Sequence, residues 1–208
     1  MKETEQIPYY AVDIPFDIVY RKNRTAAPVK PHTHNALEIY FTLTDLPDVL
    51  LNDTLSGVSS GSLVVIPPHC VHQLFTHRLT VYERYIITIN SNWLGTVLSG
   101  DPQLMPYNTP SAAPAVIPLS AKDLSVLQNA LEAYMRSAPA AGIGRYSDFF
   151  TLLTLIDSLI SKGLQKSSAS ALSISPSQKR VNEIIAFINR HIPEPIGMGE
   201  IADAFHLN

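Results

Sequence analysis

The chain has 208 residues, of which 46% are hydrophobic and 16% are charged, and its formal net charge is −3 at pH 7. A chain of this length and apolar content can bury a sizeable core, as one domain with an appendage or as two small domains. The charge argues against a dedicated nucleic-acid-binding protein, because such domains concentrate Lys and Arg.

The cysteine content and the first residues bear on the compartment. Cys70 is the single cysteine, so no internal disulfide can form and a reducing compartment fits. Residues 1–20 contain Pro8 and Pro15 and lack the basic flank and apolar run of a signal peptide. No segment approaches 18 uninterrupted apolar residues. We therefore expect a cytoplasmic protein without a membrane span.

Short strands separated by turn signals are expected over residues 1–90. The opening arm, residues 1–31, has Tyr9 and Tyr10 between prolines and contains a strand candidate, Asp17–Tyr20. Further strands are expected over segments with alternating or continuous apolar residues: 37–43, 49–51, 63–66 and 79–89. Several short strands before any convincing helix predict a β-barrel or a sandwich.

Polar residues able to bind a metal or a ligand gather around two of these strands. His32, His34 and Glu38 occupy even positions, which share one face of an extended chain. His72 follows the strand 63–66, which ends at Pro67 because proline cannot sit in a central ladder.

The face that these residues occupy has two interpretations. Tyr40 lies on the same face, whereas the opposite face carries Leu37, Ile39 and Phe41 and is the more apolar one. The polar set could therefore face solvent. In the strand 79–89, Tyr82 and Arg84 could line a barrel, or Arg84 could form a surface pair with Glu83.

The histidines and glutamate resemble the two sequence motifs of the cupin superfamily. The positions that match the motif offsets are His32, His34, Glu38, Gly61, Pro67 and His72. The positions that depart from the motifs are Ala26, Asp45, His69 and Thr76. The glycine departures put the tight turns in question, since Ala and Asp reach positive φ less freely than Gly. The resemblance implies a cupin-like double-stranded β-helix, a jelly roll, whose polar set faces inward.

Helix signals dominate after residue 90. A short helix is expected at Trp93–Leu98, followed by a Pro-rich connection over residues 99–119. Ser120, with Asp123 three residues later, predicts the start of a helix. A second helix is expected at Tyr146–Lys162, with an apolar stripe formed by Phe149, Leu152, Leu153, Ile156, Leu159 and Ile160. This hairpin could pack on the barrel, form a dimer seam, or do both.

A serine-rich linker is expected at residues 165–177, followed by a helix over 178–191 and a short helix over 201–205. The stretch VNEIIAFINRHIPEPIGMGEIADAFHLN resembles the opening of the DNA-binding domain of AraC-type transcriptional regulators. The order also resembles theirs: a barrel in residues 1–110, a dimerising hairpin in 111–164, a linker, and the start of a helix-turn-helix in 178–208. We expect this helix-turn-helix to be truncated, so that DNA is bound only through a longer protein.

The resemblances imply a fold that is mainly β with α, and the ligand-sensing portion of a homodimeric, non-enzymatic regulator of transcription. A small-molecule effector would contact the residues that the barrel turns inward: His32, His34, Glu38, Tyr40, His72 and Tyr82. In the regulator reading, Tyr9 and Tyr10 fold over this effector. His32, His34, Glu38 and His72 also suit a divalent ion such as Zn, Ni, Fe or Mn. A metal-dependent cupin isomerase or dioxygenase is therefore the alternative.

Overall fold

The computed structural model describes residues 7–25, 30–75, 80–99, 101, 104–137, 142–169, 184 and 197–205. The strands in these residues are β1 (Tyr9–Tyr10), β2 (Phe16–Thr25), β3 (Thr33–His34), β4 (Ala36–Thr42), β5 (Leu46–Leu51), β6 (Thr54–Val58), β7 (Ser62–Ile66), β8 (His72–Phe75), β9 (Thr80–Asn90) and β10 (Ala115–Pro118). The helices are α1 (Ser91–Val97), α2 (Ala121–Ser137), α3 (Ile143–Ala169) and α5 (Met198–Phe205).

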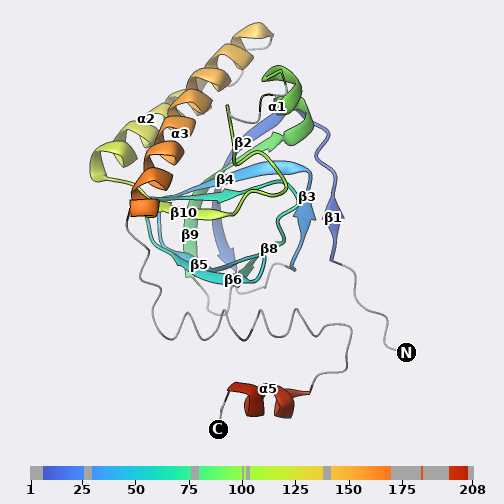
Figure 1. The fold of residues 1–208 in the computed structure, drawn as a ribbon. Coiled ribbons are helices and arrows are strands. Elements are labelled where there is room, and N and C mark those ends of the chain that lie inside the picture. The colour runs from blue at the N-terminus through green and yellow to red at the C-terminus, as the bar shows by residue number, and fades with distance from the viewer. Residues whose placement is uncertain are drawn as a thin grey trace.

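Two antiparallel sheets form the barrel. The larger has the order β10-β7-β4-β9-β2 and the smaller the order β6-β5-β8, while β1 pairs with β3 in a short parallel ladder. In Figure 1 the smaller sheet lies below the larger sheet, and α2 and α3 lie above the larger sheet. The molecule therefore has three layers, helices on sheet on sheet, and confirms the expected mainly β fold with a helical hairpin.

Both faces of β4 are buried, which decides between the two interpretations of its alternation. All residues of β4 are buried. Leu37, Ile39 and Phe41 face α2 and α3 in what we call the outer core, whereas Tyr40 packs between the two sheets in the inner core. The polar face that carries Glu38 and Tyr40 therefore points into the barrel and is not solvated.

The helical hairpin covers the outer face of the larger sheet. Its expected apolar stripe is buried in the outer core, where Phe149 stacks on Phe16 of β2 with ring centroids 3.7 Å apart. Ser120 begins α2 as predicted, since its hydroxyl accepts a hydrogen bond from the Asp123 backbone N–H at 3.2 Å. A side chain at Gly163 of α3 would overlap the Ile117 side chain of β10, so the backbone of α3 packs directly against Ile117 there.

The structure contains two strands that the sequence did not predict, β6 and β8, and it differs from the prediction in two connecting segments. The Pro-rich connection contains β10, which pairs with β7 through Ala115–Pro118. Because β10 is an edge strand, its proline interrupts no central ladder. Helix α3 continues to Ala169 and so includes the first five residues of the segment expected to be a linker.

Helix α5 confirms the short helix expected over residues 201–205 and begins earlier, at Met198. The remainder of the expected linker, and the helix expected over 178–191 apart from Ile184, lie outside the described residues.

Two positions show how the turns accommodate the departures from the cupin motifs. His69 has φ of 62°, in the left-handed region where the motif has a glycine; His is one of the residue types enriched at such φ values. Asp45 also replaces a glycine, and its carboxylate accepts a hydrogen bond from the Ser60 backbone N–H at 2.8 Å. In the turn at Asp45, a side-chain hydrogen bond therefore stabilises the position that is a glycine in the motif.

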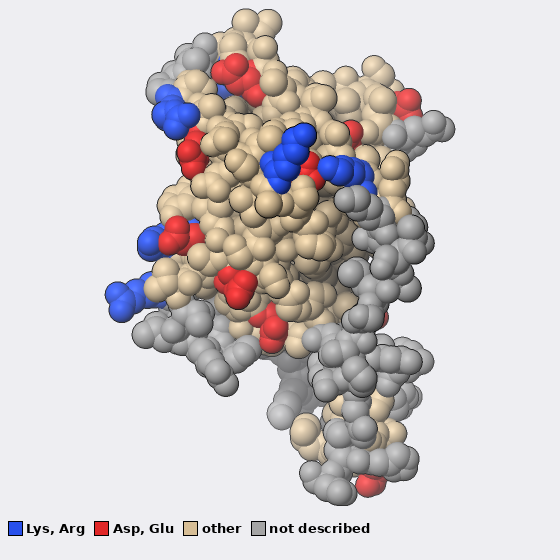
Figure 2. All heavy atoms as spheres, turned by 90° about the vertical axis from the view of Figure 1, so that its left-hand side faces the viewer, with Lys and Arg blue, Asp and Glu red and all other residues tan. Residues whose placement is uncertain are grey.

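No helix within the described ranges combines the length and apolar character needed to cross a membrane. Figure 2 shows the side of the molecule that is on the left in Figure 1, where basic and acidic side chains are interspersed and separated by uncharged surface. This mixture gives that face no electrostatic preference for a polyanion.

Candidate ligand and metal site

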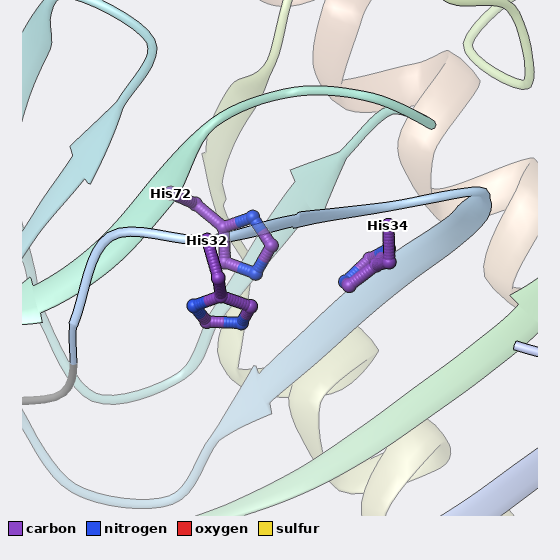
Figure 3. Close-up of side chains that lie close together, drawn as sticks. All are labelled: His32, His34 and His72. Atoms are coloured by element: carbon purple, nitrogen blue, oxygen red, sulfur yellow. The ribbon is translucent and has the colours of Figure 1, made fainter. Parts of the chain in front are cut away.

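His32 and His72 are brought together by the backbone. Each donates its N–H to the carbonyl of the other, at 3.1 and 3.0 Å, in an isolated antiparallel bridge. Side chains of directly paired residues lie on the same side of the ladder, and the two ring centroids are 4.2 Å apart. Two imidazoles that are 40 positions apart in sequence therefore sit side by side, as Figure 3 shows.

His34 approaches the pair from the end of β3. Its backbone carbonyl accepts the His69 N–H at 2.8 Å, which ties β3 to the loop before β8. The His34 and His72 ring centroids are 4.9 Å apart, and in Figure 3 His34 points toward the same space as the other two rings. The structure thus brings the three predicted histidines together.

Glu38 lies at the centre of the polar cluster. Its Oε2 is 3.3 Å from His34 Nε2 and 3.1 Å from His72 Nε2, and it accepts a hydrogen bond from the Tyr40 hydroxyl at 3.1 Å. Burial alone would raise the pKa of Glu38, but hydrogen bonds and charge from His34 and His72 lower it by more, so the net pKa lies well below its usual range. Glu38 is therefore ionised inside the barrel.

The carboxylate and burial also perturb the groups around it. Burial lowers the pKa of His72, but Glu38 raises it more, and the net shift is upward. Burial lowers the pKa of His32, and neighbouring His72 lowers it too. The pKa of Tyr40 is raised well above its usual value by burial and then by Glu38, so its hydroxyl stays a donor.

Backbone carbonyls fix the ring tautomers of two histidines. His32 Nδ1 lies 3.1 Å from the Lys30 carbonyl, and His72 Nδ1 lies 3.0 Å from the Cys70 carbonyl. A carbonyl only accepts, so both Nδ1 atoms carry a proton, and each neutral ring presents the lone pair of Nε2. Metal-binding histidines are usually held in this way by a second hydrogen bond.

The donor set fits a divalent metal. One ligand atom each from His32, His34 and His72 lies within 4.8 Å of the others. Although His72 Nε2 is close to Glu38, this contact lacks hydrogen-bond geometry, and the buried nitrogen has no hydrogen-bond partner in the described structure. His34 would have to change tautomer, because its Nδ1 now accepts the Ala36 N–H at 3.4 Å. Imidazoles with one carboxylate suit Zn or another first-row ion.

The N-terminal arm borders the cluster. Tyr10 meets His32 edge to face, with centroids 5.6 Å apart, and Tyr9 stacks on His69 at 6.0 Å. Both tyrosines are more than half exposed, so they form the outer edge of the site. The sequence suggested this arm by its aromatic residues, but the pairing of β1 with β3 has no signal in the sequence.

Tyr82, also predicted as a ligand contact, lies elsewhere in the barrel. It is 1% exposed in the inner core and packs against the Arg84 guanidinium rather than the histidines. Arg84 is itself buried and points inward, while Glu83 pairs with Lys22 on the opposite face at 2.7 Å. Of the two interpretations of Arg84, the surface pair is therefore wrong.

Cys70 and His77 add no chemistry to the site. Burial raises the pKa of the Cys70 thiol to about 11, so it remains protonated and unreactive at neutral pH. His77 lies outside the described residues.

Comparison with known proteins finds similar proteins by structure alone. No protein-family model matches the sequence, and no curated protein matches it. Apo ToxT K231A from Vibrio cholerae, an AraC-family regulator, is 13% identical, covers 96% of this chain and 73% of its own, and has a TM-score of 0.50. ToxT from Vibrio cholerae O395 bound to (E)-4-(8-methylnaphthalen-1-yl)but-3-enoic acid is 14% identical over 94% and 73% of the two chains, with a TM-score of 0.48.

A cupin 2 barrel protein from Salinispora arenicola CNS-205 is 17% identical over 42% of this chain and 74% of its own, with a TM-score of 0.35. The expected cupin-like, β-rich fold is shown by the two antiparallel sheets of the structure itself. At 13% identity, the likeness to apo ToxT K231A concerns the fold alone.

Proposed function

We propose that this chain is the effector-sensing and dimerisation portion of an AraC-type transcriptional regulator that acts in the cytoplasm. The observation that carries the proposal is a polar site inside a cupin barrel whose outer face is covered by a helical hairpin. The likeness in fold to ToxT, which extends over 96% of this chain, supports the same reading.

The route from ligand to hairpin runs through β4. Glu38 and Tyr40 face the inner site, while the alternate residues Ile39 and Phe41 pack in the outer core with Phe149 and other residues of α3. A ligand that moves β4 therefore also moves the surface on which the hairpin rests. Coupling of this kind requires the ligand to bind the two arrangements of the hairpin with different affinities.

The hairpin supplies the proposed dimer surface. A cavity of about 430 Å³ lies between α2 and α3, with Ala130, Ala133, Leu152 and Leu155 among its lining residues. Val126 and Met135 of α2 are apolar and exposed. Burial of such side chains against a second copy would stabilise a homodimer, and binding of DNA would belong to the complete regulator.

A metal-dependent cupin enzyme is the second candidate, and one observation favours it. His72 Nε2 is buried without a hydrogen-bond partner among the described residues, which suits a metal ligand better than a hydrogen-bonding residue. A bound divalent ion would act as a Lewis acid on an oxygen-containing ligand. His32, His34, Glu38 and His72 would hold the ion, and Tyr40 would orient Glu38 through its hydroxyl.

The decisive experiment is a thermal-shift screen of sugars, organic acids and amines, with and without ZnCl₂, NiCl₂ or MnCl₂. A sensor is expected to be stabilised by a ligand, by about 2.7 kcal/mol at 100 times its Kd, and to change its dimer dissociation constant when the ligand is bound. His34→Ala should abolish the response, whereas Asn129→Ala on the exposed side of α2 should retain it. Turnover of a ligand by the metal-loaded protein, with no change in dimerisation, would favour the enzyme.

A further inference from the structure

Arg84 of β9 is a buried cation that forms no ion pair with the described residues. It is 7% exposed, and within the described residues no carboxylate forms an ion pair with it. Its NH1 donates to Asn23 Oδ1 at 2.9 Å, while its buried Nε has no hydrogen-bond partner there. An arginine has five N–H donors, and a buried charge is normally paired. Arg84 therefore has donors to spare.

Two aromatic rings hold the guanidinium in position. Its Cζ lies 5.1 Å from the centroid of Tyr40 and 5.1 Å from that of Tyr82. Contacts of this type attract a cation to the ring face, but they leave the N–H groups at the guanidinium edge unsatisfied. Tyr40 also donates its hydroxyl to Glu38, which links Arg84 to the histidine cluster through one side chain.

A second arginine adds positive charge beside Arg84. In the register of β2 and β9, Arg21 is directly opposite Arg84, so both side chains leave the same face of the sheet. Like charges directly opposite each other destabilise an antiparallel pair. On the other face the neighbouring pair is Lys22 with Glu83, which is balanced. The unbalanced pair is thus the one on the barrel's inner side.

The inward-facing residues are less covered on this side of the barrel. Inward residues of β4 and β7, such as Tyr40 and Val64, are buried between the two sheets. Inward residues of β2 and β9 are less covered: Val19 and Ile86 are partly exposed and Arg21 is exposed. A ligand that enters along β2 and β9 would reach Arg84 next to apolar residues of the inner core.

We propose that Arg84 is the receptor for an anionic group, and that the effector of this barrel is a small organic carboxylate with an apolar body. Nε and a terminal nitrogen of Arg84 donate to the two carboxylate oxygens, because the guanidinium edge matches that planar group. Tyr40 and Tyr82 flank the acid group, and Val19 and Ile86 contact the body. This inference rests on the proposed sensor function and adds its ligand class.

The test compares acids with neutral analogues of the same shape by calorimetry and thermal shift. The probes are benzoate against benzamide and 3-phenylpropionate against its amide, with inorganic phosphate as a separate anion. We expect the carboxylates, but not the amides or phosphate, to stabilise the wild-type chain. Arg84→Gln should weaken carboxylate binding roughly 10- to 150-fold, the range for loss of a charge-assisted hydrogen bond.

Two further variants separate recognition from folding. Arg84→Lys keeps the charge but loses the planar fork, so we expect an intermediate affinity. Arg24→Gln removes a guanidinium from the exposed outer face of the same strand pair, and should bind as wild type does. Without ligand, Arg84→Gln should unfold at no lower denaturant concentration than wild type, because it removes an uncompensated buried charge. A large loss of stability there would assign Arg84 to packing and overturn the inference.

The outcomes also separate this inference from the sensor proposal. Equal binding of acids and amides, phosphate in place of carboxylates, unchanged carboxylate binding by Arg84→Gln, or no binding of any carboxylate would overturn the role of Arg84. Binding of a neutral ligand that is lost in His34→Ala and unchanged in Arg84→Gln would also overturn the role of Arg84, but would support the sensor function. Carboxylate binding through Arg84 without any effect on dimerisation would support Arg84 as the carboxylate receptor and contradict the sensor function.

Discussion

Replacement of Glu38 provides a quantitative test of the polar cluster. Its Oε2 accepts from Tyr40 and His34 at 3.1 and 3.3 Å inside the barrel. In Glu38→Leu these two buried donors lose their acceptor, at about 1–3 kcal/mol each, or about 2–6 kcal/mol together. Removal of a desolvated carboxylate offsets part of this loss. We therefore expect the free energy of unfolding to fall by roughly 2–4 kcal/mol.

Glu38→Gln separates hydrogen bonding from charge. Its amide oxygen can accept from the same donors, so we expect a loss of about 1 kcal/mol or less, whereas metal affinity should fall strongly because the anionic ligand is gone. Glu83→Gln is the matched control on the outer face of the sheet. Its partner Lys22 has a side chain that is 59% exposed, and such pairs contribute about 0–1 kcal/mol.

Urea unfolding of the metal-free protein, followed by far-UV circular dichroism, measures these differences. The expected order of stability is wild type, close to Glu83→Gln, then Glu38→Gln, then Glu38→Leu. If Glu38→Leu unfolded at the wild-type midpoint, the carboxylate would not be the acceptor that holds the cluster, and the reasoning about the inner site would be refuted.

Three further predictions concern the metal site, the outer core and the helix packing. Zinc affinity, measured by calorimetry, should fall as the pH falls through the pKa of His72, which is raised from its ordinary value because Glu38 outweighs burial, since the ligand must lose a proton; a constant affinity would contradict ligation by His72. Phe149→Ala should lower the free energy of unfolding by about 3–5 kcal/mol in a single urea transition, and two separate transitions would show that hairpin and barrel do not share a core. Gly163→Ala should lower the free energy of unfolding by about 1–3 kcal/mol, because the added Cβ would overlap Ile117. The control Gly144→Ala, where the added Cβ meets no atom within 4 Å, should be neutral or stabilising by up to about 1 kcal/mol. Equal thermal stabilities of the two variants would contradict the close contact.

The sequence predicted β2, β4, β5, β7, β9 and the helical hairpin, because their apolar residues repeat with periods that belong to strands and helices, but it did not predict β6 or β8. It could not decide which way β4 faces, since alternation defines two faces but does not say which one is covered. Both faces of β4, one with Phe41 and the other with Tyr40, are buried because the hairpin forms a third layer, whose position is set by contacts distant in sequence. Only the cupin resemblance indicated that the face with Glu38 and Tyr40 points into the barrel.

The features that sequence reasoning missed are set by tertiary contacts. β10 lies among prolines and forms a strand only because β7 has a free edge beside it. The extension of α3 through serines to Ala169 reflects tertiary context over a weak local preference. The inward orientation of Arg84 had a signal, its even spacing with Tyr82, but a buried arginine is rare enough that a surface pair with Glu83 was equally reasonable.

The main-chain bridge between His32 and His72 has a consequence for engineering. The spacing of these two positions is set by reciprocal amide bonds, so it does not depend on the side chains attached there. Exchange of either imidazole for a carboxylate or a thiolate should therefore alter which ions or ligands are preferred while the backbone stays in register. The ligand or metal selectivity of this part of the barrel could therefore be changed by substituting positions 32 and 72 alone.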